Sequence, residues 1–521
     1  MIPAYFIKIP SIPLTPNGKL NRNLLPEIPS EEQNIEEPST KTEKQLAEVI
    51  TNILGKKKLN INSSFLDLGL DSLNIIKAQT MLLKYNYVLT TQDFYKYPTI
   101  KKLSQRIDAN ISNFDEQDVQ IPKQFKHTNA NLEEALNNIN IDDDTLGNVF
   151  LTGSNGFVGI HVLYELLNTT NNTIYCLVRG RSYEHSLERL TKAYKFYFNT
   201  DISKYINDRI IVVSGDVTLP NFGIDISVFN TYINKFSTII HTAAIVKHYG
   251  SFSDFEKINI NGTKSISAFA FAYKKRLIHI SSISVSGNYL VKQCNRDVTF
   301  SENTLYIGQH YTDNVYVNSK FESEKIVLSY MEKGLIAQIH RIGILSARYS
   351  DGMFQEKIYE NAFYNRLKSM VQIGAVTDSM LPQMIEFTPI DYCASAIVLL
   401  AKQSACNNKI YNLYNPNLVS IKDLIVSFKK SNVLISILSE KEFDERLHML
   451  SSESDSSLSY IINDVTYNSN HLLTLNYDYT VHIKADFTQK YLEKLNFKWP
   501  YPDSDYIKKL LDYMKKTHFI N

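Results

Sequence analysis

The sequence predicts an α/β protein with a small helical bundle and, after it, a doubly wound parallel sheet that carries a smaller, mostly helical C-terminal subdomain. Residues 71–84 contain neither Gly nor Pro and are expected to be helical. From Val149 onward, short apolar runs alternate with longer helical patterns, which is typical of a parallel sheet covered by helices on both faces. After about residue 350 this regularity weakens, so the remainder is expected to form the subdomain.

Composition restricts the class of protein. The chain has 521 residues, 44% of them hydrophobic and 21% charged, which is typical of globular material in several domains. Lys+Arg 55 against Asp+Glu 54 leaves no basic excess, so nucleic-acid binding has no electrostatic support. The four cysteines are dispersed and form no Cys-x-x-Cys pair, which argues against a zinc site and favours a reducing compartment.

Nothing in the sequence predicts a membrane span. No uninterrupted apolar run reaches the length needed to cross a bilayer. The N-terminus lacks a basic segment followed by an apolar core, as a signal peptide would have. We therefore expect a soluble, cytoplasmic protein.

The segment before residue 27 is too short to form a core of its own. Residues 1–26 contain the turn Pro16-Asn17-Gly18, which presents Lys19. Residues 27–40 are acidic and contain proline, so they are expected to form a linker.

A small helical domain is expected over residues 41–108. Its first helix covers about 41–54, and its closing helix starts near Pro98 and runs to about residue 107. Between them, Ser72 lies in the first turn of a helix, where Asp71 can cap the exposed N–H groups. One interpretation of Ser72 is that it serves only as a helix cap.

Residues 109–146 are rich in Asn, Asp and Gln and are expected to form a second linker, with one helix around 132–140. The third and largest domain is expected over 147–521, with its nucleotide-binding core at about 147–350. Strands are expected at 149–151, 173–178, 209–213, 238–241, 277–280 and 338–342, and helices at 159–167, 183–198 and 315–333.

A glycine-rich turn follows the first strand of this domain and opens its first helix. The glycines allow a tight turn and let the backbone approach a pyrophosphate, while the helix N-terminus supplies N–H groups to the phosphates. In this strand–turn–helix setting the motif predicts dinucleotide binding on a Rossmann-type sheet. The residues expected to bind the cofactor here are Thr152, Gly153, Asn155, Gly156, Phe157, Val158 and Gly159.

The end of the second strand distinguishes the two nicotinamide cofactors. An NAD site usually has a carboxylate there, whereas this chain has Arg179 and Arg181. Because a guanidinium pairs well with a phosphate, these arginines predict NADPH, bound through its 2′-phosphate. The alternative is a solvated pair of arginines. Further cofactor contacts are expected at the ends of the third and fourth strands, from Asp216 and Val217 and from Ala243 and Ala244.

Three residues form the expected catalytic group. Tyr316 and Lys320 are four residues apart on one helix, so they lie on the same face. A protonated Lys320 is expected to lower the pKa of Tyr316 and to contact the cofactor, and Tyr316 can then donate a proton to a carbonyl oxygen while hydride reaches the carbon. Ser282 ends a strand, where its hydroxyl can hold the same oxygen.

The run Leu68-Gly69-Leu70-Asp71-Ser72-Leu73 and the later Pro98-Thr99-Ile100 resemble the acyl or peptidyl carrier domains of nonribosomal peptide and polyketide synthases. The resemblance implies that Ser72 carries a 4′-phosphopantetheine arm, attached by a phosphopantetheinyl transferase. The run around Lys19 resembles the last motif of adenylation domains, whose lysine contacts an acyl-adenylate. Because the rest of such a domain is missing, we interpret residues 1–26 as an adenylation-domain remnant.

The order of glycine turn, arginine, serine pair, Tyr316 and Lys320 resembles the extended short-chain dehydrogenase/reductases, and among them the thioester reductase domains of nonribosomal peptide synthetases and carboxylic acid reductases. The resemblance selects Ser282 rather than Ser281 as the active hydroxyl. The chain departs from the family at Arg341-Ile342-Gly343, where Arg-Pro-Gly is usual. It departs again at Val315, where Gly is usual, and at His241-Thr242, where His-Asn is commoner.

The two resemblances together imply a carrier-linked enzyme. The carrier presents an acyl or peptidyl thioester, loaded by an upstream adenylation or synthetase module, and the reductase releases it with NADPH as an aldehyde, or further reduced as an alcohol. Three alternatives stay open: non-reductive release, a ketoreductase or epimerase acting on a free small molecule, and a carrier or docking fragment that binds NADPH without turnover.

Overall fold

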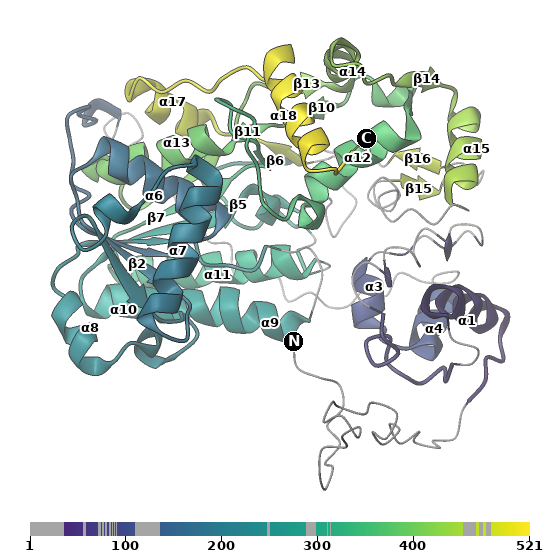
Figure 1. Ribbon diagram of the computed structural model, residues 1–521, viewed down its shortest axis with the longest axis horizontal. Helices are drawn as coiled ribbons and strands as arrows, with labels where there is room; N and C mark the ends of the chain where they lie inside the picture. The colour runs from purple at the N-terminus through teal and green to yellow at the C-terminus, as the bar shows by residue number, and fades with distance from the viewer. Residues whose placement is uncertain are drawn as a thin grey trace, which may run out of the picture.

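The computed structural model of the chain contains a smaller helical body and a larger α/β body, each with its own apolar core (Figure 1). It describes residues 36–55, 59–70, 74–75, 78, 81–82, 85, 87, 89, 91–109, 136–246, 251–287, 298–309, 311–312, 314–451, 465–467, 473–475 and 481–520. Lys19, Ser72 and most of the expected 109–146 linker lie outside these residues.

The N-terminal body is a small helical bundle. Helix α1 (Lys41–Leu54) begins with a capping box, in which Thr40 and Glu43 each accept a hydrogen bond from the other's backbone N–H. Helices α3 (Thr91–Lys96) and α4 (Ile100–Ala109) complete the described part. The apolar faces of all three meet in one core, to which Leu70 and Ile75, on either side of Ser72, also contribute.

The larger body is built on a seven-stranded parallel sheet in the order β12-β7-β5-β4-β1-β2-β3. The chain builds β1, β2 and β3 outward in one direction and then crosses to the other side of β1, which creates a switch point between β1 and β4. The strands are β1 (Val149–Thr152), β2 (Ile174–Val178), β3 (Ile210–Ser214), β4 (Thr238–His241), β5 (Arg276–Ser282), β7 (Ala337–Ile342) and β12 (Lys409–Leu413).

Helices cover both faces of this sheet (Figure 1). Along each strand, successive apolar residues point to opposite faces of the sheet, as the pleat requires. One face packs against α6 (Phe157–Thr169), α7 (Tyr183–Phe198) and α13 (Ile390–Lys402). The other packs against α8 (Ile226–Tyr232), α10 (Asn261–Ala272) and α11 (Val315–Glu332).

Beyond residue 350 the chain forms a second apolar core but also returns to the first. Helices α12 (Ala362–Ile373), α14 (Ile421–Lys430), α15 (Glu440–Ser451) and α18 (Ser504–Lys516) share the second core. In contrast, β12 adds the outermost strand to the main sheet, and α13 and α17 (Asp486–Lys494) pack on that sheet's core. The nucleotide-binding core is therefore completed by segments far along the sequence.

Small strand pairs and short helices connect these elements. The pairs are β6 (Val298–Phe300) with β17 (Val481–Ile483), β8 (Leu345–Ser346) with β11 (Thr388–Pro389), β9 (Ala375–Thr377) with β14 (Ser436–Leu438), β10 (Met384–Ile385) with β13 (Val419–Ser420), and β15 (Val465–Tyr467) with β16 (Leu473–Leu475). The short helices are α9 (Phe252–Phe255), the π-helix η5 (Glu256–Ile260), and the 3-10 helices η3 (Ser203–Tyr205), η4 (Pro220–Gly223), η6 (Ile283–Ser286), η7 (Ile358–Glu360), η8 (Asp378–Met380) and η9 (Ser404–Cys406).

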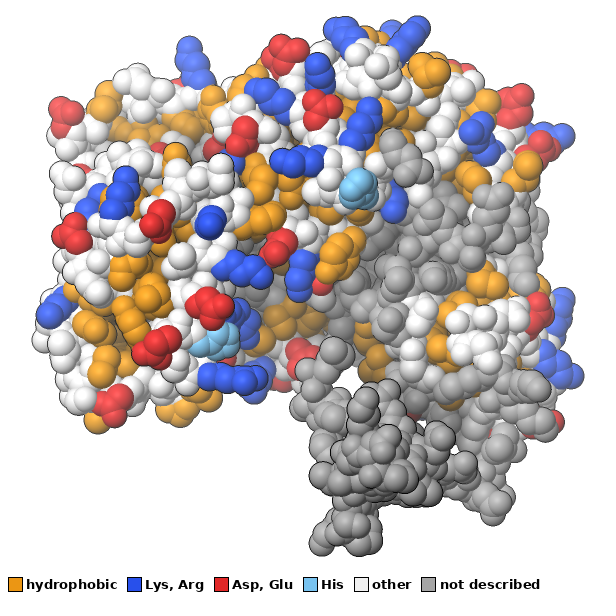
Figure 2. Space-filling model, in the orientation of Figure 1, with side chains coloured by type: hydrophobic (Ala, Val, Ile, Leu, Met, Phe, Trp, Pro, Cys, Tyr) orange, Lys and Arg blue, Asp and Glu red, His pale blue; other side chains and the backbone are white. Residues whose placement is uncertain are grey.

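Two surface properties agree with the composition. On the face shown in Figure 2, basic and acidic side chains are interspersed over the sheet and helix body. Within the described ranges, every helix is too short or too polar to cross a bilayer.

Candidate functional site

The glycine turn lies where β1 approaches the loop after β4. Gly153 has φ +70°, a conformation that L side chains rarely adopt, and a Cβ atom there would lie 2.7 Å from the backbone N of Ala243. A Cβ on Gly159 would collide with the carbonyl oxygen of Gly153. Both positions therefore require glycine, which explains how the turn stays narrow enough for a pyrophosphate to reach the N-terminus of α6.

Hydrogen bonds from β4 fix the base of this turn. Thr242 donates through Oγ1 to the carbonyl of Thr152 at 2.7 Å, and Thr152 Oγ1 and His241 Nδ1 are 2.8 Å apart. Thr152 is fully buried, so its side chain anchors the turn from the protein interior. Thr242 stands where Asn is commoner, and its side chain still forms a hydrogen bond that joins the end of β4 to β1.

The expected phosphate-binding arginines lie at the end of β2, joined by a third to which the sequence alone assigns no role. Arg179 and Arg181 are exposed. Arg189, on α7, donates to the carbonyl oxygen of Arg179. Burial, and after it the positive charge of Arg179, lower the pKa of Arg189. Two cations in proximity form a site suited to a phosphate.

At the end of β3, Asp216 lies in a turn. Its carboxylate accepts a hydrogen bond from the backbone N–H of Thr218 at 2.9 Å, and its own N–H donates to the carbonyl of Phe222 at 2.7 Å. Val217 beside it is buried and packs near Gly262 at the start of α10. The expected cofactor residues at the ends of β2, β3 and β4 are thus brought to one edge of the sheet.

The three expected catalytic residues also meet. Tyr316 and Lys320 lie one turn apart on α11 and are both buried. The Ser282 hydroxyl at the end of β5 lies close enough to the Tyr316 hydroxyl to lower its pKa. Lys320 Nζ donates to the carbonyl oxygen of Ile280, two residues before Ser282, at 2.8 Å. A tyrosine hydroxyl and a serine hydroxyl therefore converge on one point.

The electrostatics of this group correct one expectation. The sequence predicts that Lys320 lowers the pKa of Tyr316, but burial raises it, and the Ser282 hydroxyl opposes that effect only in part. The pKa of Lys320 itself is lowered to about 8 by burial, with the negative charge of Glu324 acting in the other direction. Tyr316 is therefore a phenol near neutral pH, which is the form that donates a proton.

A further residue to which sequence reasoning assigns no role is Asn259, in the π-helix η5. Its side chain accepts from the N–H of Ile245 at 2.8 Å and donates to the carbonyl of the same residue at 2.9 Å. It also donates to Ser319 Oγ on α11 at 2.8 Å. Asn259 thereby ties the loop after β4 to the turn of α11 that carries Tyr316. Its position in a π-helix, a form frequent at functional sites, is the local signal of such a role.

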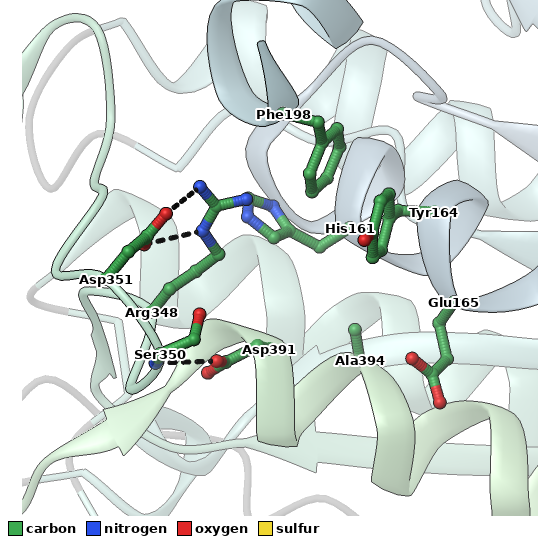
Figure 3. A pocket seen from close by; sticks show the side chains of 9 residues that line it. All are labelled: His161, Tyr164, Glu165, Phe198, Arg348, Ser350, Asp351, Asp391 and Ala394. Carbon is green, nitrogen blue, oxygen red and sulfur yellow. Dashed lines mark hydrogen bonds and ion pairs between the residues drawn. The ribbon is translucent and has the colours of Figure 1, made fainter. Parts of the chain in front are cut away.

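A cavity of about 250 Å³ lies away from these residues, between α6, the end of α7 and α13 (Figure 3). Its polar lining is largely satisfied internally. Arg348 forms a two-pronged ion pair with Asp351, and Asp391 accepts from the backbone N–H groups of residues 349 and 350. Ser282, Tyr316 and Lys320 are absent from its lining, so it is distinct from the catalytic group.

Two known families match parts of the chain, one in each body. Residues 44–107 match the family described as phosphopantetheine attachment site, and residues 151–397 match an NAD-binding family described as male sterility protein. The chain is 24% identical to a linear gramicidin synthase component of Brevibacillus parabrevis over an alignment 535 positions long, which covers 99% of this chain and 10% of that protein. It is also 24% identical to the L-2-aminoadipate reductase large subunit of Candida glabrata, covering 86% of this chain and 35% of that protein. The chain thus spans a tenth to about a third of these relatives.

Solved structures extend the similarity to the arrangement of domains. A thiolation-reductase di-domain from an archaeal nonribosomal peptide synthetase superposes with a TM-score of 0.77 at 28% identity, covering 94% of this chain and all of that one. The reductase domain of the aureusimine biosynthetic cluster superposes with a TM-score of 0.60 at 26% identity, covering 75% of this chain and 99% of that domain.

The fold and the matches define the class: a nicotinamide-cofactor-binding domain on a parallel sheet, similar to the reductase domains of nonribosomal peptide synthetases, preceded by a domain that matches the phosphopantetheine attachment family. In particular, the chain has the architecture of the thiolation–reductase proteins of nonribosomal peptide synthesis.

Proposed function

We propose that this chain reduces an acyl or peptidyl thioester held on its own carrier domain, using NADPH, and releases the product as an aldehyde. The observation that carries the proposal is the convergence of Tyr316, Lys320 and Ser282 at the sheet edge that also holds the glycine turn, in a chain with a phosphopantetheine attachment domain. A second reduction of the aldehyde would give the alcohol.

NADPH is favoured over NADH by the arginines after β2. Arg179 and Arg189 stand close together, no carboxylate among the described residues forms an ion pair with either, and a 2′-phosphate would relieve their repulsion. Gly153 and Gly159 form the cradle that a Cβ would fill, as a bound pyrophosphate requires. When bound, NADPH supplies the hydride.

In the proposed reaction, Tyr316 and Ser282 hold the thioester carbonyl oxygen by hydrogen bonds. As the carbonyl carbon gains hydride, the oxygen becomes an alkoxide and takes the phenolic proton of Tyr316, giving a hemithioacetal. That species collapses: the C–S bond breaks, the sulfur takes a proton, and the aldehyde leaves. Lys320 stabilises the phenolate form of Tyr316 until a proton returns to it.

Ser72 is the proposed attachment point of the 4′-phosphopantetheine arm, within a carrier domain over residues 41–108. The arm would present the thioester to the reductase domain at residues 147–521 at high local concentration, because both belong to one chain. A phosphopantetheinyl transferase and an upstream adenylation or synthetase module are the proposed partners. Lys19 stays a prediction of an adenylation-domain remnant.

A soluble acyl-pantetheine thioester tests the chemistry without the carrier. We expect oxidation of NADPH with equal formation of free thiol and aldehyde, identified by mass spectrometry. Formation of free acid or a cyclic product without NADPH oxidation would instead establish non-reductive release.

A further inference from the structure

Three consecutive residues of β5 meet three residues of α11 that are spaced one turn apart. The carbonyl of Ile280 accepts from Lys320, Ser281 donates to Glu324, and Ser282 lies close enough to Tyr316 to lower its pKa. Because Tyr316, Lys320 and Glu324 follow one another at intervals of four residues, they form a single row along the helix. The contact between Ser281 and Glu324 has no part in the reaction described above.

Glu324 is buried and bound on several sides. Its side chain and that of Arg341, on β7, are both 0% exposed. Arg341 Nε lies 3.1 and 3.0 Å from the two carboxylate oxygens of Glu324, and Nη2 lies 2.8 Å from Oε2. Arg341 also donates to the carbonyl of Ser301 at 3.2 Å and stacks over the ring of Phe300. The carboxylate therefore joins β5, β7 and α11 behind the catalytic residues.

The charged and titratable groups around Lys320 come from four elements. His241 on β4 and His279 on β5 have pKa values lowered by burial. Both imidazoles are therefore uncharged and neither stabilise nor repel the Lys320 ammonium by charge. Tyr316 on α11 is a neutral phenol, and the charge of Arg341 on β7 is paired with Glu324. Glu324 is the carboxylate whose charge acts on Lys320 in this layer.

We propose that Glu324 is a positioning residue for the reductase site, which keeps Lys320 in its ammonium form and holds it against β5 through the Arg341–Glu324–Ser281 network. The inference rests on the proposed function, because it assigns Glu324 a role in that reaction through Lys320. Glu324 itself does not touch the reacting atoms.

The proposal has a consequence for pH. The reaction needs Lys320 as an ammonium group, so kcat falls as pH rises through the pKa of Lys320. Removal of the nearby negative charge makes the ammonium less stable, which moves this alkaline limb to lower pH. With the two groups one helical turn apart, a displacement of about one pH unit or more is expected.

The test compares Glu324→Gln with the double variant E324Q/R341M in the full chain. The single variant leaves Arg341 buried without its partner, which is strongly destabilising, whereas the double variant removes both charges of the pair and is expected to regain most of the melting temperature. Both variants are expected to show the displaced alkaline limb of kcat, with NADPH affinity within about threefold of the parent. Glu324→Asp, which keeps the charge, is expected to restore most of the parent profile.

Glu302→Gln is the matched control. Glu302 is also a buried carboxylate, 3% exposed, but it binds Thr488 on α17 and not the row on α11. We expect this variant to lose melting temperature with no displacement of the alkaline limb.

An alkaline limb that stays in place in the double variant would overturn the proposal, as would a double variant that cannot fold, because Glu324 would then serve the fold alone. These outcomes are separable from failure of the proposed function, since they are scored only after the parent chain oxidises NADPH with acyl-pantetheine, while melting temperature and NADPH affinity are measured without turnover.

Discussion

At the scale of the residue, the site depends on where charge is buried. Spacing places Tyr316 and Lys320 on one face of a helix, but the order of the motifs and the resemblance to a known family are needed to make them, with Ser282, the candidate catalytic group. The direction of the Tyr316 pKa is not predictable in this way, since it depends on burial by residues distant in the chain. Glu324 and Arg189 are missed for the same reason: their partners, Arg341 and Arg179, lie on other elements.

Replacement of Tyr316 by Phe removes the proposed proton donor and leaves the ring in place. We expect kcat to fall by roughly two to four orders of magnitude. The dissociation constant of NADPH, measured by fluorescence, should stay close to that of the parent. A variant that keeps most of its turnover would show that another group supplies the proton.

Arg189→Ala tests the proposed phosphate site. We expect NADPH binding to weaken about tenfold or more, because a charge-assisted hydrogen bond is lost, while NADH binding is unaffected. Lys192→Ala is the control, since Lys192 is an exposed cation one turn further along α7. Equal weakening of both cofactors by Arg189→Ala would contradict a role at the 2′-phosphate.

The pH dependence follows from Lys320. Its pKa of about 8 lies below the ordinary value of 10.5 because burial disfavours the ammonium form. The required ammonium form is therefore present below about pH 8 and lost as the pH rises through that value. A profile of kcat against pH should show this decline at saturating NADPH. A rate that stays constant far above this range would exclude Lys320 as the controlling group.

At the scale of the element, alternation of short apolar runs with helical patterns correctly indicates the first six strands of the main sheet and helices α6, α7 and α11. The seventh strand, β12, and its neighbour α13 are not anticipated. They follow residues 350–389, where the short strands and turns of the second core interrupt the alternation, and only tertiary packing returns the chain to the sheet.

The glycine turn can be tested as an element. Gly153→Ala places a Cβ against the backbone of Ala243, so we expect binding of NADPH and NADH to be lost together. Gly334→Ala is the matched control: Gly334 also has positive φ, at +104°, but a Cβ there meets nothing within 4 Å. Both substitutions carry a backbone penalty of roughly 1–2 kcal/mol, so a difference in cofactor binding isolates the close approach.

At the scale of the whole molecule, the sequence predicts a carrier domain followed by a reductase domain, and the family matches at 44–107 and 151–397 confirm that pairing. This is possible because each domain contains a motif whose residues are contiguous. The identity of the acyl chain is not predictable, because the sequence beyond about residue 350 contains no such contiguous motif. The central proposal is that the carrier domain delivers its thioester to the reductase domain of the same chain.

The most direct test of that proposal is NADPH consumption by the full chain after a phosphopantetheinyl transferase has loaded it with an acyl-pantetheine group. We expect one aldehyde for each NADPH oxidised. The Ser72→Ala variant should fail to be loaded and so fail to oxidise NADPH in this assay, while it still reduces soluble acyl-pantetheine. Loading that is confirmed by mass spectrometry and followed by no NADPH oxidation would contradict carrier-coupled reductive release.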